Sequence, residues 1–146
     1  MKSYTDIKQS KKLAEILPIE SADCYWDYDE MQKFHRICWF EDGFNKESQL
    51  RFNENNVCAW SLAALMNLLP SEFTEKGKYS ETTYNIDIRK YALTENVDLY
   101  QIAYGNYIFY EDGNRSWKDM VDTGEKENLI DAAFQMICWL KENGKI

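Results

Sequence analysis

The residues best suited to chemistry lie between Tyr25 and Glu30, where aromatic rings are mixed with carboxylates. A flat ring such as Trp26 can stack on a sugar or a base. The spacing Asp27-x-Asp29-Glu30 offers oxygens to a divalent cation, but a calcium loop needs further oxygens and a turn glycine, which are missing here. The sequence therefore predicts no metal site and no cofactor. It leaves two interpretations open: a ligand-binding surface, or core aromatics with solvated acids between them. The candidate binding residues are Tyr25, Trp26, Asp27, Asp29 and Glu30.

The single histidine and the four cysteines form no familiar catalytic or metal-binding pattern. His35 and Cys38 are three residues apart on an expected strand, so their side chains face opposite sides, and zinc sites usually need three or four ligands. A cysteine distant in sequence can still pair with a histidine as a nucleophile, so the chemical role of His35 stays open. Because no nucleophile-elbow, P-loop or dinucleotide-binding motif occurs, we do not expect an enzyme. One alternative is a small hydrolase or ligand-binding domain with its site near Tyr25, Trp26 and Asp27.

The charge of the chain limits its partners. A formal net charge of -8 repels phosphate backbones, so direct nucleic-acid binding is not expected. The same charge allows a second alternative, an acidic mimic of nucleic acid that inhibits a basic host protein, with Asp27, Asp29 and Glu30 on an exposed ridge. No apolar run of signal-peptide length begins the chain, which favours a cytoplasmic protein without membrane contacts. In that compartment we expect reduced and mostly buried thiols at Cys24, Cys38, Cys58 and Cys138.

The stretch Val57–Pro70 is the most apolar part of the chain, with only two polar side chains. Ser61 is a good N-cap, because its hydroxyl can accept a hydrogen bond from a free amide of the first turn. Pro70 lacks an amide proton and disfavours helix in the residue before it. These features predict a helix over residues 61–69 that is covered on most sides and lies in the core.

The remaining periodicities predict one α+β domain over residues 1–146. Helical spacing indicates a helix over residues 5–17, capped by Thr5 or Asp6 and ended by Pro18. Strands are expected over residues 34–40, 84–89, 99–104 and 107–110, and more weakly over 117–121. Polar segments 44–56 and 71–82 read as loops, and turns are expected at Glu41-Asp42-Gly43, Gly105-Asn106 and Glu111-Asp112-Gly113. The expected fold is an antiparallel sheet of three to five strands packed against about three helices.

The last helix is expected over residues 127–143 and carries one aromatic residue on the wrong face. Its apolar stripe ends at Leu140, whereas Trp139 lies off the stripe near Gln135, and Cys138 lies nearly opposite the stripe. The indole needs a cover, which is either a neighbouring segment of the chain or a second subunit, since aromatics are enriched in interface cores. Trp139, Gln135 and Cys138 are therefore candidate interface residues, and a homodimer is one expected partner arrangement.

Four segments together resemble a family of small proteins from anaerobic gut bacteria and their phages and mobile elements. They are SADCYW at residues 21–26, AWSLAALMNLLP at 59–70, YNIDIRK at 84–90 and LIDAAFQMICWL at 129–140. The resemblance implies a bacterial cytoplasmic protein of mobile-element origin. The family has no established activity, so the resemblance implies no catalytic or binding residues. From the residues themselves we expect a non-enzymatic protein-binding or regulatory module.

Overall fold

A computed structural model describes residues 2–146 of the chain. Its contacts divide the chain into two compact units, Met1–Leu68 and Leu69–Ile146, which we call the N-terminal and C-terminal units. The prediction of a single domain stays a prediction, and each unit is described by itself below.

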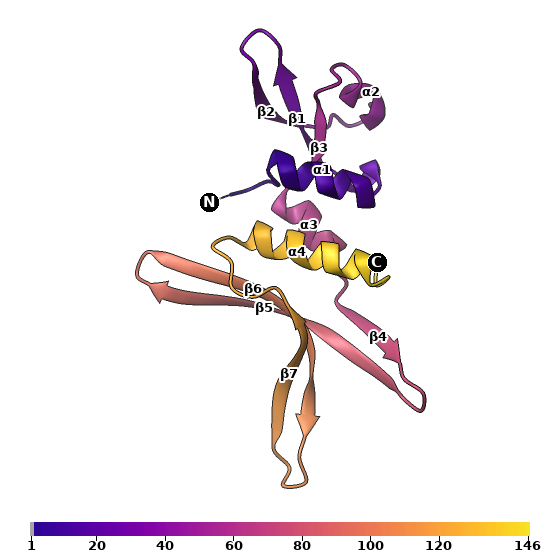
Figure 1. Cartoon of the computed structure of the whole chain (residues 1–146), viewed down its shortest axis with the longest axis vertical. Coiled ribbons are helices and arrows are strands. Elements are labelled where there is room, and N and C mark those ends of the chain that lie inside the picture. Colours follow the sequence, from indigo (N-terminus) through magenta and orange to yellow (C-terminus); the bar gives the residue numbers. More distant parts are fainter. Residues whose placement is uncertain (1) are drawn as a thin grey trace. The chain divides into compact units, whose positions relative to one another are not determined.

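The N-terminal unit builds a three-stranded antiparallel sheet with short helices around it (Figure 1). The sheet order is β2-β1-β3, with β1 in the centre. Trp60 is fully buried here, and its indole nitrogen donates to the Ser21 hydroxyl at 3.0 Å. The elements in chain order are α1 (Ile7–Ile16), the 3-10 helix η1 (Ile19–Ser21), β1 (Cys24–Asp29), β2 (Phe34–Trp39), α2 (Lys46–Leu50), β3 (Val57–Ala59) and α3 (Leu62–Leu68).

Two helix starts in this unit follow from their capping residues, as the sequence predicted. The Asp6 carboxylate accepts a hydrogen bond from the Gln9 amide at 2.8 Å, and the Gln9 side chain accepts from the Asp6 amide, which makes a capping box. The Ser61 hydroxyl accepts from the Ala64 amide at 3.2 Å at the start of α3. Helix α3 buries Ala64 and Leu65. Its opposite side, with Ala63, is exposed, so the helix is less enclosed than expected.

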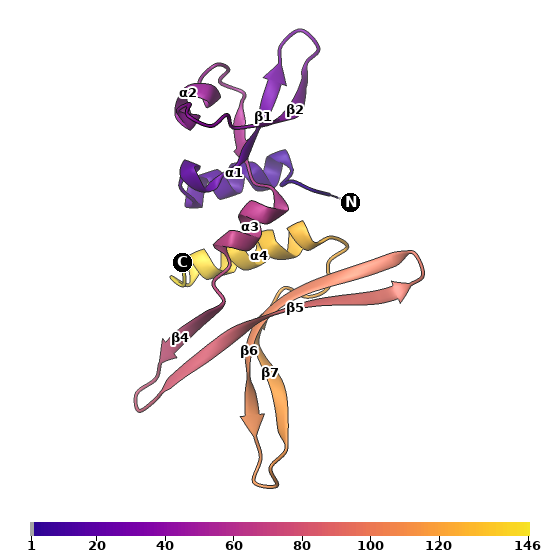
Figure 2. The ribbon, with the colours of Figure 1, turned by 180° about the vertical axis from the view of Figure 1, so that it is seen from behind.

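The C-terminal unit is a four-stranded antiparallel sheet in the order β4-β5-β6-β7 with one helix against it (Figures 1 and 2). Its hairpins β4–β5, β5–β6 and β6–β7 point in three different directions, because the long strands β5 and β6 each take part in two of them. The elements are β4 (Glu72–Lys76), β5 (Glu81–Thr94), β6 (Val97–Phe109), β7 (Arg115–Asp122) and α4 (Leu129–Glu142).

One face of this sheet carries the core of the C-terminal unit. Helix α4 packs against β6, and Phe73 of β4 lies with its ring centroid 5.0 Å from that of the buried Tyr104. The Tyr104 hydroxyl donates to the Pro70 carbonyl at 2.6 Å. Burial raises the pKa of this phenol, so it stays a neutral donor. Alternate residues of the strands point away from α4 and make the opposite face, which holds the side chains of Arg89 and Gln101.

The α+β prediction with antiparallel strands is confirmed, although the strands form two sheets rather than one. Four local predictions were wrong. Gly105 and Asn106 form no turn, because β6 runs through them with a bulge in its pairing to β7. Glu41-Asp42-Gly43 is a turn between β2 and α2 instead of a hairpin turn, since β2 pairs back on β1. The expected loops 44–56 and 71–82 contain α2 and β4. Within residues 2–146 no helix is both long and apolar enough to span a bilayer.

Candidate functional site

The predicted binding residues of Tyr25–Glu30 do not meet at one place. Because successive side chains of a strand point to opposite faces, Tyr25, Asp27 and Asp29 lie on one face of β1 and Trp26 on the other. The Tyr25 ring packs on Phe40 with the ring centroids 5.0 Å apart. The Trp26 indole donates to the Thr5 carbonyl at 3.0 Å. Both rings thus have partners within the N-terminal unit.

The three acids of this segment are also engaged. Asp27 is half-buried, and its carboxylate accepts from the Arg36 guanidinium at 3.0 Å. Asp29 accepts from two backbone amides of the following turn, at 2.9 Å each. Glu30 is exposed and accepts from the Asn53 side chain at 3.0 Å. Each of these carboxylates therefore has a hydrogen-bond partner within the N-terminal unit, and Glu30 is at the same time exposed.

No metal-binding cluster forms in the described part of the chain, and the single histidine and the cysteines have other surroundings. Within residues 2–146, no three side chains among His, Cys, Asp and Glu converge to hold a metal ion. The His35 ring packs on Tyr28 at 4.9 Å between centroids, and its Nε2 lies 3.1 Å from the Asn55 carbonyl oxygen. The four cysteines are free thiols, as predicted, and three of them are buried. Burial raises the pKa of the Cys24 and Cys58 thiols, which keeps both of them protonated and poorly nucleophilic.

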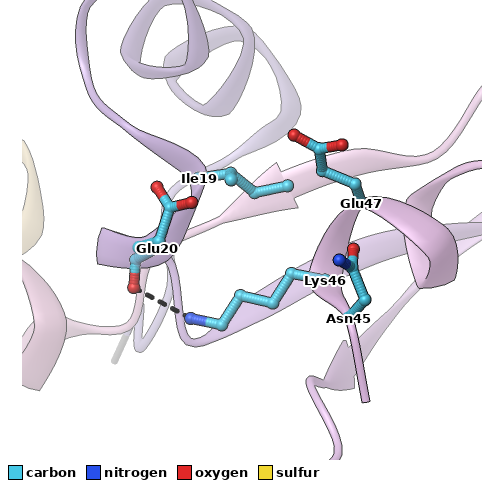
Figure 3. Close-up of a pocket in the computed structure, with 5 residues that line it drawn as sticks. All are labelled: Ile19, Glu20, Asn45, Lys46 and Glu47. Carbon is cyan, nitrogen blue, oxygen red and sulfur yellow. Dashed lines mark hydrogen bonds between the residues drawn. The ribbon is translucent and has the colours of Figure 1, made fainter.

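A hollow of about 360 Å³ in the N-terminal unit has a cation at its wall (Figure 3). The Lys46 ammonium donates to the backbone carbonyl of Glu20 at 2.9 Å and also to that of Ala22. These two hydrogen bonds connect α2 to the η1 segment, so the Lys46 ammonium is engaged with the protein backbone beside the hollow. The residues lining the hollow are Ile19, Glu20, Asn45, Lys46 and Glu47.

The candidate interface residues of α4 differ in exposure. Gln135 is exposed, Trp139 is half-buried and Cys138 is buried. The indole of Trp139 lies against Phe73 of β4, with 6.1 Å between ring centroids. A neighbouring strand of the same unit therefore covers part of the indole.

The largest run of exposed apolar side chains in the C-terminal unit lies on the β6–β7 hairpin, away from α4 (Figures 1 and 2). We call its outer part, residues 105–119, the aromatic arm. Four consecutive large residues are exposed there, and Phe109 is the most open, with 73% of its surface accessible. The four alternate between the faces of the ribbon, so that Tyr107 and Phe109 lie on one face and Ile108 and Tyr110 on the other. Each face of the arm thus exposes two large apolar side chains, and exposed apolar side chains that gather on one element are candidates for contact with another molecule.

The arm is ordered by contacts among its own side chains. The rings of Tyr107 and Trp117 meet edge to face with 5.3 Å between centroids, and the guanidinium of Arg115 lies 4.6 Å from the Tyr107 centroid. On the other face the hydroxyls of Tyr110 and Ser116 are 3.0 Å apart. At the turn the Tyr110 amide donates to the Asn114 carbonyl at 2.8 Å. The arm can thus hold its shape without a helix over it, although a bare hairpin is only marginally stable.

A charged network fixes the base of the arm to the rest of the sheet. The guanidinium of Arg89 on β5 donates to both carboxylate oxygens of Asp119 on β7, at 2.6 and 2.9 Å, and to Asp87 at 2.6 Å. The Trp117 indole donates to Asp119 at 2.6 Å. Hydrogen bonds from Arg89 hold the pKa of Asp119 below its usual range. Arg89 is therefore largely satisfied within the protein, and the network positions the arm rather than binding an anion.

Shallow hollows lie beside the base of the arm on both faces of the sheet. The first has a volume of about 470 Å³ and is lined by Asn85, Ile86, Asp87, Arg89, Tyr107 and Trp117. The second has a volume of about 460 Å³ and is lined by Tyr84, Asn106, Ile108, Lys118, Asp119 and Met120. Each offers room for a side chain of a partner next to the exposed rings.

Sequence reasoning missed this surface because it placed a turn at Gly105 and so divided the strand that builds the arm. The available signal was the run of four large apolar residues Tyr107–Tyr110 directly before the correctly predicted Glu-Asp-Gly turn. Residues next to a hairpin turn lie at the tip of the ribbon, so such a run indicates apolar side chains outside the core.

Comparisons with protein-family models, curated proteins and solved structures found no match to this chain.

Proposed function

We propose that this chain is a protein-binding module and that the aromatic arm is its binding element. The observation that carries the proposal is the exposure of Tyr107, Ile108, Phe109 and Tyr110 on one ordered ribbon. Burying a side chain of this size releases about 1.5–3 kcal/mol. Burial of these four side chains by a partner would therefore contribute favourable free energy to binding.

The charges of the arm suit a partner with an apolar groove. The acids Glu111 and Asp112 at its turn are matched by Arg115 and Lys118 on β7, so the arm is close to neutral within an acidic chain. Docking it into an apolar groove brings little net charge into the contact, and aromatic anchors surrounded by polar groups are typical of such interfaces.

The geometry does not favour the two alternative functions, an acidic mimic of nucleic acid and a small hydrolase or ligand-binding domain. An acidic mimic needs Asp27, Asp29 and Glu30 on an open ridge, whereas these acids are held by hydrogen bonds within the unit. A ligand site near Tyr25, Trp26 and Asp27 needs side chains that the strand sends to opposite faces.

The proposal is tested by placing the photoreactive residue p-benzoylphenylalanine at position 109 of the full chain in host cells. Irradiation should join the chain to one discrete partner protein. The matched control carries the same residue at position 79, since Tyr79 is an aromatic on the β4–β5 hairpin that is even more open than Phe109, with 90% of its surface accessible. The control should not capture that partner, and Tyr107→Ser should reduce capture at position 109 at least about tenfold. Equal capture from both positions, or adducts only between two copies of this chain, would overturn the proposal.

A further inference from the structure

Half of strand β5 lies at an unpaired edge of its sheet. Strand β4 pairs with residues 81–85 of β5, and the Ile86 amide donates to the Ser71 carbonyl at 2.9 Å. Beyond this point β5 continues to Thr94, and within residues 2–146 no strand pairs with its outer side. The open segment is therefore residues 87–94, which ends at the β5–β6 turn.

The backbone groups along this edge point outward and are ready to pair. In an antiparallel ladder, alternate residues direct both N–H and C=O to the same neighbour. Ile102 and Tyr100, which lie opposite Ile88 and Lys90, direct their backbone groups away from β5, to Thr123 and Lys126. It follows that Ile88, Lys90 and Ala92 direct their N–H and C=O groups outward. Such an edge is a template for an added strand.

Four of the eight side chains along the edge are apolar, and its three charged side chains, Asp87, Arg89 and Lys90, are in ion pairs. Leu93 is 66% accessible, and Ile88 and Tyr91 are about two-fifths accessible. The Lys90 ammonium donates to Asp98 of the same hairpin at 2.8 Å, and Arg89 is held by Asp119. Lysines on edge strands usually repel an incoming strand. Here the pairing with Asp98 weakens that protection.

We propose that the added strand is β5 of a second copy of this chain, paired antiparallel about a two-fold axis at Tyr91. In this register residues 89–93 pair with the same residues of the copy, and the pairing stops before Thr94, where a bulge shifts the β5–β6 register. Lys90 lies opposite Ala92 of the copy, and Tyr91 faces Tyr91 of the copy as a close pair. Registers centred on Arg89 or Lys90 would place like charges opposite each other.

The pairing joins two four-stranded sheets into one and leaves the aromatic arm outside the contact. It is therefore independent of the proposed function and tested separately. Five paired residues make a small interface, so we expect a dimer that dissociates at about 10 µM.

The test is the mass of the full chain by light scattering and sedimentation at concentrations up to about 100 µM. The unchanged chain should shift from monomer to dimer over this range. Tyr91→Glu and Tyr91→Lys should each weaken the dimer about 100-fold, because each places like charges at the two-fold axis. A mixture of the two variants should restore a dimer, since only a residue that faces itself gives this result. The control Tyr79→Glu should dimerise like the unchanged chain.

Each variant should first give the circular dichroism spectrum of the unchanged chain, so that its mass is compared for a folded protein. A chain that stays monomeric up to about 100 µM would overturn the proposal. So would a dimer that both Tyr91 variants retain, or one that the mixture fails to restore.

Discussion

The indole ring of Trp117 lies directly over Gly105 on the neighbouring strand. A Cβ atom added to Gly105 would overlap the carbonyl oxygen of Lys118 and approach the indole to within 2.9 Å. The glycine coincides with the bulge in the β6–β7 pairing. Only a residue without a side chain leaves room for the indole to lie over this strand, where it contacts both Tyr107 and Asp119. The pair thus connects the arm to the network at its base.

Gly105→Ala should destabilise the C-terminal unit by about 1–3 kcal/mol, because the clash with a backbone oxygen cannot be relieved by rotating a side chain. Urea denaturation followed by circular dichroism measures the change. Gly113→Ala is the matched control in the same arm. Gly113 has a positive φ but nothing within 4 Å of an added Cβ, so this variant should show only the conformational cost, about 1 kcal/mol. An equal loss for both variants would show that the contact of Gly105 with Trp117 contributes nothing.

The hydrogen bonds from Arg89 to Asp119 should make part of the stability depend on pH. The folded pKa of Asp119 is depressed, so its contribution is fully present above the unfolded value of about 4 and is lost as the pH falls through the folded value. Asp119→Asn should cost about 1–2 kcal/mol at pH 7 after allowance for solvent screening. The difference between the two proteins should shrink towards pH 3, which urea denaturation at several pH values measures.

An exposed ion pair serves as the control for this prediction. Asp98→Asn removes the partner of Lys90 and should change stability by no more than about 1 kcal/mol at pH 7. If Asp119→Asn cost no more than this control, or if its cost did not fall in acid, the network would not hold the base of the arm.

The start of α3 should depend on Ser61 and Asp23 together. The Asp23 carboxylate accepts from the Ser61 amide at 2.8 Å and from the Ser61 hydroxyl, which in turn caps the helix. Ser61→Ala should cost about 1–2 kcal/mol, and its effect should fall when Asp23 is already Ala, because the two side chains share one interaction. Denaturation of the two single variants and the double variant measures this coupling. If the free-energy changes of the two single variants simply added up in the double variant, the coupling would be contradicted. The control is Ser3→Ala at an exposed site nearby, which should change stability by less than about 0.5 kcal/mol.

The sequence by itself determined the local features of this protein. Helix starts at Asp6 and Ser61 were predictable because a cap satisfies backbone amides a few residues away. The alternating pattern around Tyr84–Arg89 and the turn at Glu111–Gly113 were predictable for the same local reason. The α+β class follows from these patterns.

Only the tertiary structure decided which distant residues meet. It paired Ser61 with Asp23 and Arg89 with Asp119, and it continued β6 through Gly105, where the indole of Trp117 lies in the space that a side chain would need. It also sent Tyr25 and Trp26 to opposite faces of a strand, so that the segment richest in chemical groups makes no single site. The aromatic arm and the open edge of β5 depend on which strands find partners, and pairing between distant strands leaves no local signal in the sequence.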